Sequence, residues 1–341
     1  MSYDVTIGIP FYRSVDTIDQ AFESAMSQTY ESIEFLLIDD SGNDGSLAKV
    51  QDMIQHHPRG KDVRIISHEH NIGVAASRNE IIDKAQGEFV YFLDSDDVID
   101  ENTISLLMKH ARKHDAEIVF GSYEKMDLNG RKTLYQYPYK VFTELDQLAV
   151  YAYRKFGGIQ ASACNYIVKT SLLRTNKHYF LNSNYWEDLA FTFDLVTFVS
   201  RAVLLPNVTY SYLCRPNSLS HYQERENVSK DEIMQTVQII DHLKRCSPYM
   251  ISKPYYPNRC CQVVMTDFYI ACQILKMRNY ILPKVLNKEI KQLMRHPATF
   301  RHICFFRQSR MKNLFLYIIA KLSPILCVFT IWCLGKSKKL I

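Results

Sequence analysis

The chain has 341 residues, enough for one large domain or two ordinary ones, and its 47% hydrophobic and 23% charged residues exclude a disordered or low-complexity protein. Its nine Cys residues lack zinc-type spacing and are odd in number, which argues against a zinc site and a full disulfide framework, so we expect reduced thiols. The net charge of +5 conceals an asymmetry: residues 1–100 hold 7 Lys and Arg against 19 Asp and Glu, whereas residues 242–341 hold 18 against 2.

The first 121 residues alternate between strand and helix patterns. Apolar residues at helical spacing predict four helices, which separate short apolar runs that predict strands at 5–9, 34–38, 63–66, 89–93 and 118–120. This alternation is typical of βαβ units, so we expect an α/β fold with a mainly parallel central sheet flanked by helices. The N-terminal segment contains Asp4 and breaks at Pro10, and we do not expect it to be a signal peptide.

Beyond residue 121 the alternation loosens. We expect mixed loops and helices at 122–225 and a mainly helical, basic extension at 226–341. The predicted organisation is therefore one domain at 1–225, with a nucleotide-binding half at 1–121 and an acceptor-side half at 122–225, followed by the helical C-terminal extension.

Two acidic clusters come directly after predicted strands, Asp39-Asp40 and Asp94-Ser-Asp-Asp97. Ligands of parallel α/β sheets bind beyond the carboxyl ends of the strands, so both clusters should meet in one crevice. Capping of the next helix could explain one carboxylate but not three. Carboxylates suit Mg²⁺ or Mn²⁺, which keep open positions for substrate phosphates, and Asp96 or Asp97 could bind such a cation while Asp94 accepts hydrogen bonds from a sugar or base.

Several sequence blocks follow one another at ordinary spacing. They are Ile7-Gly-Ile-Pro-Phe-Tyr12, Ser27-Gln-Thr-Tyr30, Leu37-Ile-Asp-Asp-Ser-Gly-Asn-Asp-Gly-Ser46, Asn71-Ile-Gly-Val-Ala-Ala-Ser-Arg-Asn79, Gly87-Glu-Phe-Val-Tyr-Phe-Leu-Asp-Ser-Asp-Asp97 and Trp186-Glu-Asp-Leu-Ala-Phe191. In this order they resemble the inverting family 2 glycosyltransferases of the GT-A fold, of the type that builds bacterial capsules, O-antigens and exopolysaccharides. The similarity covers about 3–125 and continues more weakly to about 225, with Ser41-Gly42 inverting the family's usual Gly-Ser.

The resemblance implies roles for residues near the first two strands. Pro10, Phe11 and Tyr12 would wall the nucleotide base. Asp40 would accept a hydrogen bond from that base, expected to be uracil, whereas Asp39 would cap the turn.

The resemblance also implies a diphosphate and metal site. Arg78 would lie near the nucleotide or diphosphate, or alternatively form an ion pair with the crevice aspartates. Asp94-Ser95-Asp96 would be the family's DxD motif, with Asp96 as the first metal contact and Asp97 as a second.

The Glu-Asp motif supplies the candidate base. An inverting transfer needs a carboxylate that takes the proton of the attacking hydroxyl, and the family pattern selects Asp188. Glu187 and Trp186 could raise its pKa by charge and partial desolvation. The alternative is that both acids simply favour the start of a helix.

A segment near residue 215 resembles one that closes over the diphosphate in this family. Arg215 and His221 are its candidates for diphosphate or acceptor contacts, as are Glu187 and Trp186 of the Glu-Asp motif. A lone His or Arg can equally be structural.

The C-terminal end combines apolar and basic residues. The apolar stretch 314–334 approaches the roughly 20 residues that cross a bilayer, but Lys321 and Pro324 interrupt it. We therefore expect 307–341 to form a monotopic hairpin or interfacial helix whose Lys and Arg residues meet lipid head groups. A core helix or a dimer interface is the alternative, and the absence of a known reader motif excludes nucleic acid as an expected partner.

The resulting prediction is an inverting, metal-dependent glycosyltransferase on the cytoplasmic face of the inner membrane. Its expected donor is a UDP-hexose or UDP-N-acetylhexosamine, and its expected acceptor is a glycan on a polyprenyl diphosphate; a second copy of the chain is a further candidate partner. A sugar nucleotidyltransferase is one alternative, although it would need a Gly-rich basic loop where this chain has Pro10-Phe-Tyr12. A nucleotide- or glycan-binding relative without catalysis is the other.

Overall fold

The computed structural model describes residues 3–154, 158–215 and 228–341. The chain forms two compact units. The first comprises Met1–Leu148 and Ala161–Pro216, and the second comprises Ala149–Gln160 and Asn217–Ile341. The first unit is therefore interrupted by a short segment of the second.

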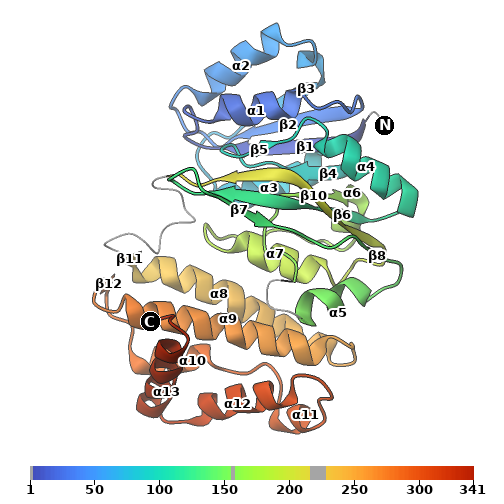
Figure 1. Cartoon of the computed structure of the whole chain (residues 1–341). Coiled ribbons are helices and arrows are strands. Elements are labelled where there is room, and N and C mark those ends of the chain that lie inside the picture. The colour runs from blue at the N-terminus through green and yellow to red at the C-terminus, as the bar shows by residue number, and fades with distance from the viewer. Residues whose placement is uncertain (1–2, 155–157, 216–227) are drawn as a thin grey trace. The chain divides into compact units, whose positions relative to one another are not determined.

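The first unit is an α/β structure (Figure 1). Its strands are β1 (Tyr3–Phe11), β2 (Ile33–Asp39), β3 (Val63–Ser67), β4 (Gly87–Phe92), β5 (Val98–Ile99), β6 (Ile118–Met126), β7 (Lys132–Tyr135), β8 (Lys140–Phe142), β9 (Tyr166–Lys169) and β10 (Ala202–Leu213). Its helices are α1 (Ile18–Met26), α2 (Ser46–His56), α3 (Val74–Lys84), α4 (Thr103–His114), α6 (Thr170–Thr175) and α7 (Glu187–Leu195), with a 3₁₀ turn at Gly60–Asp62; α5 (Gln147–Arg154) runs from the first unit into the second.

The strands form one sheet in the order β3-β2-β1-β4-β9-β6-β10-β5, with β7 beside β6 and β8 beside β10. β3, β2, β1 and β4 are mutually parallel, as are β6 and β10, whereas β9 runs antiparallel to β4 and β6. The predicted α/β fold with a mainly parallel central sheet and flanking helices is confirmed. The expectation of only loops and helices at 122–225 is wrong, because β7, β8, β9 and β10 lie there.

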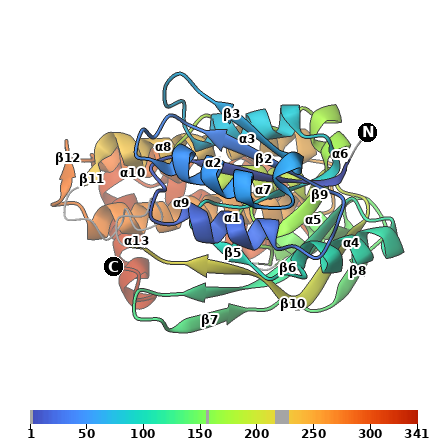
Figure 2. The ribbon, with the colours of Figure 1, turned by 90° about the horizontal axis from the view of Figure 1, so that it is seen from above.

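Alternate residues of β1 face opposite helices, because strand side chains alternate between the two faces of a sheet. Ile7 pairs with Phe35 of β2, whose ring packs edge-on against a ring of α1. The next residue, Gly8, faces α3, where an added Cβ would lie 2.4 Å from Cγ2 of Ile81. Helices thus cover both faces, with α1 beside α2 on one and α3 beside α6 on the other (Figures 1 and 2).

The second unit is mainly helical. The two-residue strands β11 (Val228–Ser229) and β12 (Ile281–Leu282) pair in parallel. The helices are α8 (Lys230–Cys246), α9 (Tyr256–Lys276), α10 (Asn287–Leu293), α11 (Phe300–Cys304), α12 (Arg310–Lys321) and α13 (Pro324–Ser337), with a 3₁₀ turn at Ser247–Met250. The predicted helical C-terminal extension is therefore confirmed.

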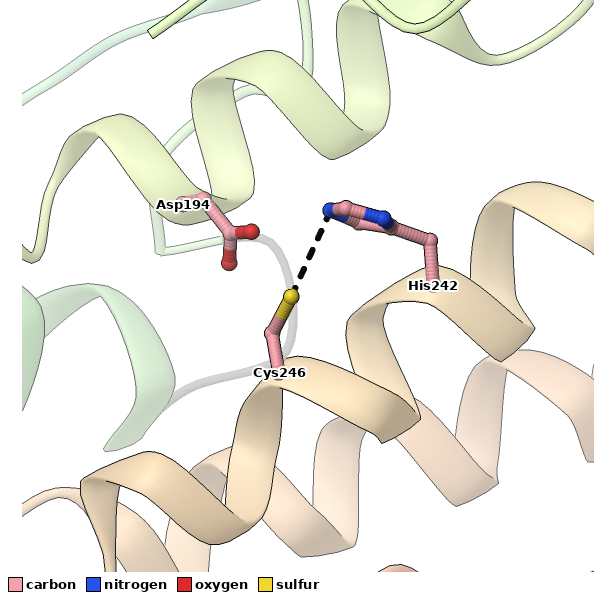
Figure 3. Close-up of side chains that lie close together, drawn as sticks. All are labelled: Asp194, His242 and Cys246. Carbon is pink, nitrogen blue, oxygen red and sulfur yellow. Dashed lines mark hydrogen bonds between the residues drawn. The ribbon is translucent and has the colours of Figure 1, made fainter. Parts of the chain in front are cut away.

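Polar side chains fix the packing of α8 against α9. The ammonium of Lys244 on α8 forms a buried ion pair with Asp267 on α9 and donates to the carbonyl of Leu293. Burial raises the pKa of Asp267 to about 7, although Lys244 opposes the rise. Near the end of α8, Cys246 Sγ lies 3.4 Å from Nε2 of His242, one turn earlier on the same helix (Figure 3).

The apolar stretch 314–334 forms two helices instead of one. α12 ends at Lys321, and the hydroxyl of Ser323 accepts from the backbone N–H of Leu326 at 3.4 Å, which caps α13. Pro324 suits the first position of a helix because its missing N–H would have no partner there. Within the described residues, no helix combines the length and apolar character that a bilayer crossing requires.

Candidate active site

The acidic cluster predicted from the sequence lies in the loop between β4 and β5. Carboxylate oxygens of Asp94, Asp96 and Asp97 come within 4.8 Å of one another. Like charges at this separation repel, and burial makes their ionisation still less favourable. Oxygen ligands in such a group are the kind that a hard divalent cation prefers, so the cluster could hold Mg²⁺ or Mn²⁺.

Asp97 ties this loop to the sheet. Its Oδ2 accepts from the hydroxyl of Tyr210 at 2.5 Å and its Oδ1 from the backbone N–H of Leu213 at 2.7 Å, both on β10. Burial, together with the charges of Asp96 and Asp94, raises the pKa of Asp97 well above its ordinary value. Asp97 is the most buried of the three acids, and its role as a second metal contact remains a prediction.

Asp96 is part-buried and forms an ion pair with Arg215. Burial and the charge of Asp94 raise the pKa of Asp96, whereas Arg215 acts in the opposite direction. Arg215 also donates to Oγ1 of Thr17 at 3.3 Å. Arg215, predicted to contact the diphosphate, thus forms its ion pair with Asp96, the predicted metal ligand. The other candidate of this segment, His221, lies outside the described residues.

Arg78 of α3 joins two predicted parts of the site. Its Nη2 lies 2.6 Å from Oδ1 of Asp94, and its Nη1 lies 2.7 Å from Oε1 of Glu187. Burial would lower the pKa of Arg78, but these two acids raise it well above its ordinary value. Arg78 therefore forms the ion pair that the sequence offered as the alternative, and its contact with a phosphate stays a prediction.

Glu187 and Asp188 are the first two residues of α7, and Trp186 precedes them with a left-handed backbone (φ 63°). Asp188 is half-buried, and its Oδ1 accepts from the backbone N–H of Leu189 at 2.7 Å. Burial and the charge of Glu187 raise the pKa of Asp188 to about 7, against the opposing effect of Arg78. A carboxyl group that titrates near neutrality can accept a proton from a substrate hydroxyl.

Asp40 is buried within a network of donors. Its carboxylate accepts from His68 Nδ1 at 2.8 Å, Asn71 Nδ2 at 2.8 Å, Ile72 N at 2.8 Å and Gly73 N at 2.9 Å. These donors match the roughly four lone-pair sites of a carboxylate. Asp40 therefore fixes the loop that leads into α3, and its predicted contact with the base would have to replace one of these bonds.

The same network contains a histidine that the sequence did not single out. His68 donates towards Asp40 through one ring nitrogen, and its Nε2 lies 2.8 Å from Oε2 of Glu80. Burial would lower the pKa of His68, but its hydrogen bonds to both acids raise it. Asp39 behaves as predicted for a turn cap, because its Oδ1 accepts from the N–H of Ser41 at 3.1 Å.

The end of β1 carries the predicted wall of the base. Pro10 and Phe11 are buried, whereas Tyr12 is 41% exposed and could stack on a planar ligand. Ser14 follows and shares a hydrogen bond of 2.8 Å with the hydroxyl of Ser95 in the acidic loop. Sequence reasoning missed Ser14 because no motif signals a contact between residues so far apart.

The site thus gathers the loops that follow β1, β2 and β4 with the start of α7, all within the first unit. It brings together Asp94, Asp96, Asp97, Arg78 and the Glu187-Asp188 pair. Chemically, this arrangement can bind a cation with an anionic ligand and remove a proton from a nearby hydroxyl.

Comparisons with known proteins bear on this chemistry. Residues 6–175 match the family model described as Glycosyl transferase family 2. The chain is 26% identical over 225 residues to Glycosyltransferase GlyG of Streptococcus pneumoniae, a match that covers 64% of this chain and 73% of that protein. It is 29% identical over 139 residues to the Escherichia coli UDP-Glc:alpha-D-GlcNAc-diphosphoundecaprenol beta-1,3-glucosyltransferase WfgD, which covers 41% of this chain and only about half, 53%, of that relative.

The fold is also known from a solved structure. The crystal structure of S. aureus TarS 1-349 resembles this chain with a TM-score of 0.61 at 17% identity, over 93% of this chain and 90% of that one. The matched residues 6–175 include the acidic loop and Arg78. The chain therefore belongs to glycosyl transferase family 2 and adopts the GT-A fold.

Proposed function

We propose that this glycosyltransferase is inverting and metal-dependent, and that the first unit moves a sugar from a UDP-hexose or UDP-N-acetylhexosamine to a hydroxyl group of a glycan. One observation carries the proposal: Arg78 forms ion pairs both with Asp94 of the acidic loop and with Glu187, the neighbour of Asp188. An acid that titrates near neutrality, joined to a cation-binding cluster, suits the removal of a proton beside a departing diphosphate. Family membership favours this function over a nucleotidyltransferase.

Each residue has a distinct task in the proposed reaction. Asp188 takes the proton of the acceptor hydroxyl as its oxygen attacks the anomeric carbon. Arg78 holds Asp94 and Glu187 at fixed positions through two separate bonds. Tyr12 stacks on the base, and the 2.8 Å bond between Ser14 and Ser95 keeps the base-binding loop in register with the acidic loop.

The residues present fit a divalent cation. Asp96 would hold it, with Asp94 and Asp97 nearby, because carboxylate oxygens are the ligands that Mg²⁺ and Mn²⁺ prefer. When bound, such a cation neutralises the charge that builds on the diphosphate leaving group. Arg215 contacts Oδ2 of Asp96 in the structure, so a cation held by Asp96 would share this carboxylate with Arg215 or replace it there.

The test is titration calorimetry of UDP in the presence of Mn²⁺ or of a chelator. We expect UDP affinity to depend on Mn²⁺ and Asp96→Asn to weaken it at least about tenfold, a change of about 1.4 kcal/mol. Asp52→Asn, on the exposed face of α2, is the matched control and should bind as the parent does. Equal Mn²⁺-dependent affinity in the parent and Asp96→Asn would remove Asp96 from the metal site.

The names of similar proteins support the choice of donor and acceptor. The TarS structure was also determined with UDP-GlcNAc, and the name of WfgD specifies a UDP-sugar donor and a diphosphoundecaprenol-linked acceptor. We therefore propose a UDP-sugar donor and a glycan on a polyprenyl diphosphate. A screen of nucleotide sugars for Mn²⁺-dependent thermal stabilisation would identify the donor, and stabilisation by none of the UDP-sugars would contradict this proposal.

The second unit is proposed to contact the cytoplasmic face of the membrane. Its last helices expose large apolar side chains, among them Phe315, Ile325, Phe329 and Trp332. No Asp or Glu follows Glu289, whereas ten Lys and Arg residues do. Apolar side chains among cations suit the boundary of an anionic lipid surface.

Vesicle sedimentation tests the membrane contact. Ile325→Glu with Phe329→Glu should abolish co-sedimentation with anionic vesicles, because charged residues cannot enter the acyl boundary. Lys61→Glu with Lys109→Glu, both at exposed positions of the first unit, is a control with two acidic substitutions outside this surface. Continued sedimentation of the α13 variant would contradict the proposal.

A further inference from the structure

We propose that the second unit contains a binding site for a lipid phosphate, meaning a phosphate monoester carried on one long hydrocarbon chain. The site is an open cavity of about 360 Å³ lined by residues of α9, α12 and α13 and by the last two residues of α5. This volume lies at the small end of the roughly 300–1,000 Å³ typical of ligand pockets, which suits one chain rather than two.

The cavity runs between single faces of two helices. From α9 it takes residues 258, 261, 262, 265, 268 and 269, and from α12 it takes residues 312, 315, 316 and 319. Both series follow the spacing of three and four residues that marks one side of a helix. The two faces therefore form continuous walls that are long enough to lie along an extended chain.

The part of these walls formed by later residues of α9 and α12 is apolar. Met265, Phe268, Leu316, Ile319 and Leu334 line it, and three of them are almost fully buried within the unit. Apolar walls of this kind do not hold water well and favour a hydrocarbon ligand. We call this part the chain end of the cavity.

The other part of the cavity, nearer the start of α9 and of α12, is polar and positively charged. We call it the head end, and its lining includes Arg154, Asn258, Gln262, Ser309 and Lys312. Hydrogen bonds already hold its neutral side chains: Ser309 Oγ donates to Asn258 Oδ1 at 2.6 Å, and Gln262 Nε2 donates to the carbonyl of Tyr153 at 2.7 Å. The neutral side chains are therefore held by bonds within the protein, whereas Arg154 and Lys312 can contact a ligand.

The charges around the cavity are uncompensated. Among the described residues, the exposed head-end cations Arg154 and Lys312 form no ion pair with Asp or Glu, and the lining contains no acidic side chain. Lys338, also exposed and without an ion pair among the described residues, lines the opposite end of the cavity, next to Leu334 and near Cys272 of α9. Lys312 lies close enough to the cavity wall to lower the pKa of Cys261, against the larger effect of burial. An anion is therefore the expected partner of the head end, and a phosphate offers several oxygens to Arg and Lys at once.

A simpler ligand would occupy only one of the two ends of the cavity. Inorganic phosphate would leave the apolar walls unused, and an uncharged amphiphile would leave the cations without a partner. A phosphate joined to a hydrocarbon chain uses both, and this is the chemistry shared by prenyl-type carriers and by phospholipids with one chain in the cavity. The inference concerns the second unit alone and does not depend on the proposed transfer reaction.

Titration calorimetry on the full chain tests the proposal with dodecyl phosphate below its micelle-forming concentration. We expect one molecule to bind per chain, with inorganic phosphate and dodecyl maltoside each at least about tenfold weaker. Farnesyl phosphate separates the sources: tighter binding than dodecyl phosphate indicates a prenyl-type carrier, and weaker binding indicates a fatty-chain phospholipid. Equal affinity for dodecyl phosphate and dodecyl maltoside, or no binding of either phosphate, would overturn the proposal.

Two variants locate the binding at this cavity. Lys312→Glu reverses a charge at the head end, and Met265→Trp fills the chain end at a half-buried position; each should weaken dodecyl phosphate at least about tenfold. Lys284→Glu and Met277→Trp, in the same unit but outside the lining, are the matched controls and should bind as the parent does. Unchanged binding in both cavity variants would place the ligand elsewhere and refute the assignment, while UDP binding reports separately on the first unit.

Discussion

Acidic residues of one site differ in role because their partners differ. Asp97 accepts two hydrogen bonds from β10, Asp94 pairs with Arg78, and Asp96 pairs with Arg215. Asp188 instead has one short bond to its own helix and a pKa raised to about 7 by burial and by Glu187. Position relative to donors, and not residue type, therefore distinguishes Asp188, the candidate base, from the acids that accept bonds from Arg78, Arg215 and β10.

Replacement of Asp188 by Asn tests its role directly. The amide keeps the shape of the side chain but cannot accept the proton, so we expect sugar transfer to fall by roughly 10²–10⁴-fold with UDP affinity retained. The measurement pairs turnover with titration calorimetry. Asp52→Asn should leave both values unchanged, and near-normal turnover of Asp188→Asn would exclude Asp188 as the base.

The raised pKa of Asp188 also predicts two pH profiles. Transfer should rise with pH around a midpoint near 7, because only the ionised carboxylate accepts a proton. Stability should change in the opposite direction. The folded protein holds this proton more tightly than the unfolded chain, so the free energy of unfolding falls as pH rises from about 4 to about 7.

Asp188→Asn removes this dependence. We expect the variant to be more stable than the parent above pH 7, by at most about 4 kcal/mol for a pKa raised from 3.8 to about 7, and equal to it near pH 4. Chemical denaturation at both pH values measures the difference. A variant less stable than the parent at pH 8 would show that the ionised carboxylate of Asp188 does not destabilise the folded protein.

At the residue scale, sequence reasoning found the acids that occur in motifs and missed residues whose partners are distant. Asp94 and Asp96 follow an apolar strand, and that position alone indicates a ligand site in a parallel sheet. Ser14 and His68 carry no such signal, because their contacts with Ser95, Asp40 and Glu80 arise only on folding.

At the scale of elements, buried parallel strands were predictable and exposed or irregular strands were not. β1, β2 and β4 are almost wholly buried and read as continuous apolar runs. β7 is exposed along its whole length, and β10 contains Pro206 where its register against β6 shifts. β7 lacks the apolar run and the alternation on which a strand prediction depends. β10 has an apolar run at 202–205 and alternation from Val208, but Pro206-Asn207 divides them into two short pieces.

The contact of β1 with α3 gives a prediction at this scale. Gly8→Ala should destabilise the protein by about 1–3 kcal/mol, because its Cβ would meet the Ile81 side chain, with Cγ2 only 2.4 Å away. Ile81→Ala creates space at the same point, so the double variant should lose less stability than the sum of the two single changes. A double-mutant cycle by urea denaturation measures the coupling, and an additive result would contradict the contact.

At the scale of the whole molecule, charge is distributed unevenly along the sequence. Residues 1–100 carry 19 Asp and Glu against 7 Lys and Arg, whereas residues 242–341 carry 2 against 18. An anionic surface should attract the C-terminal part and repel the N-terminal part. This difference was visible in the sequence, whereas the cavity of the second unit was not, because its walls come from helices that only the fold brings together.

The charge distribution predicts how salt affects membrane binding. Sedimentation with anionic vesicles should fall steeply between about 0.05 and 0.5 M NaCl, since screening shortens the reach of each charge to a few ångströms. Neutral vesicles should bind weakly at every salt concentration. Binding that does not respond to salt or to lipid charge would show that apolar insertion alone holds the protein on the membrane.

The interruption of the first unit by residues 149–160 has a consequence for how the chain is made. Tyr153 accepts from Arg259 Nη1 at 2.7 Å, a partner 106 positions later. At about 5–20 residues per second, a ribosome delivers Arg259 roughly 5–20 seconds after Tyr153. During that interval Tyr153 cannot form this contact, so the packing of residues 149–160 within the second unit is completed only after the chain has been made as far as α9.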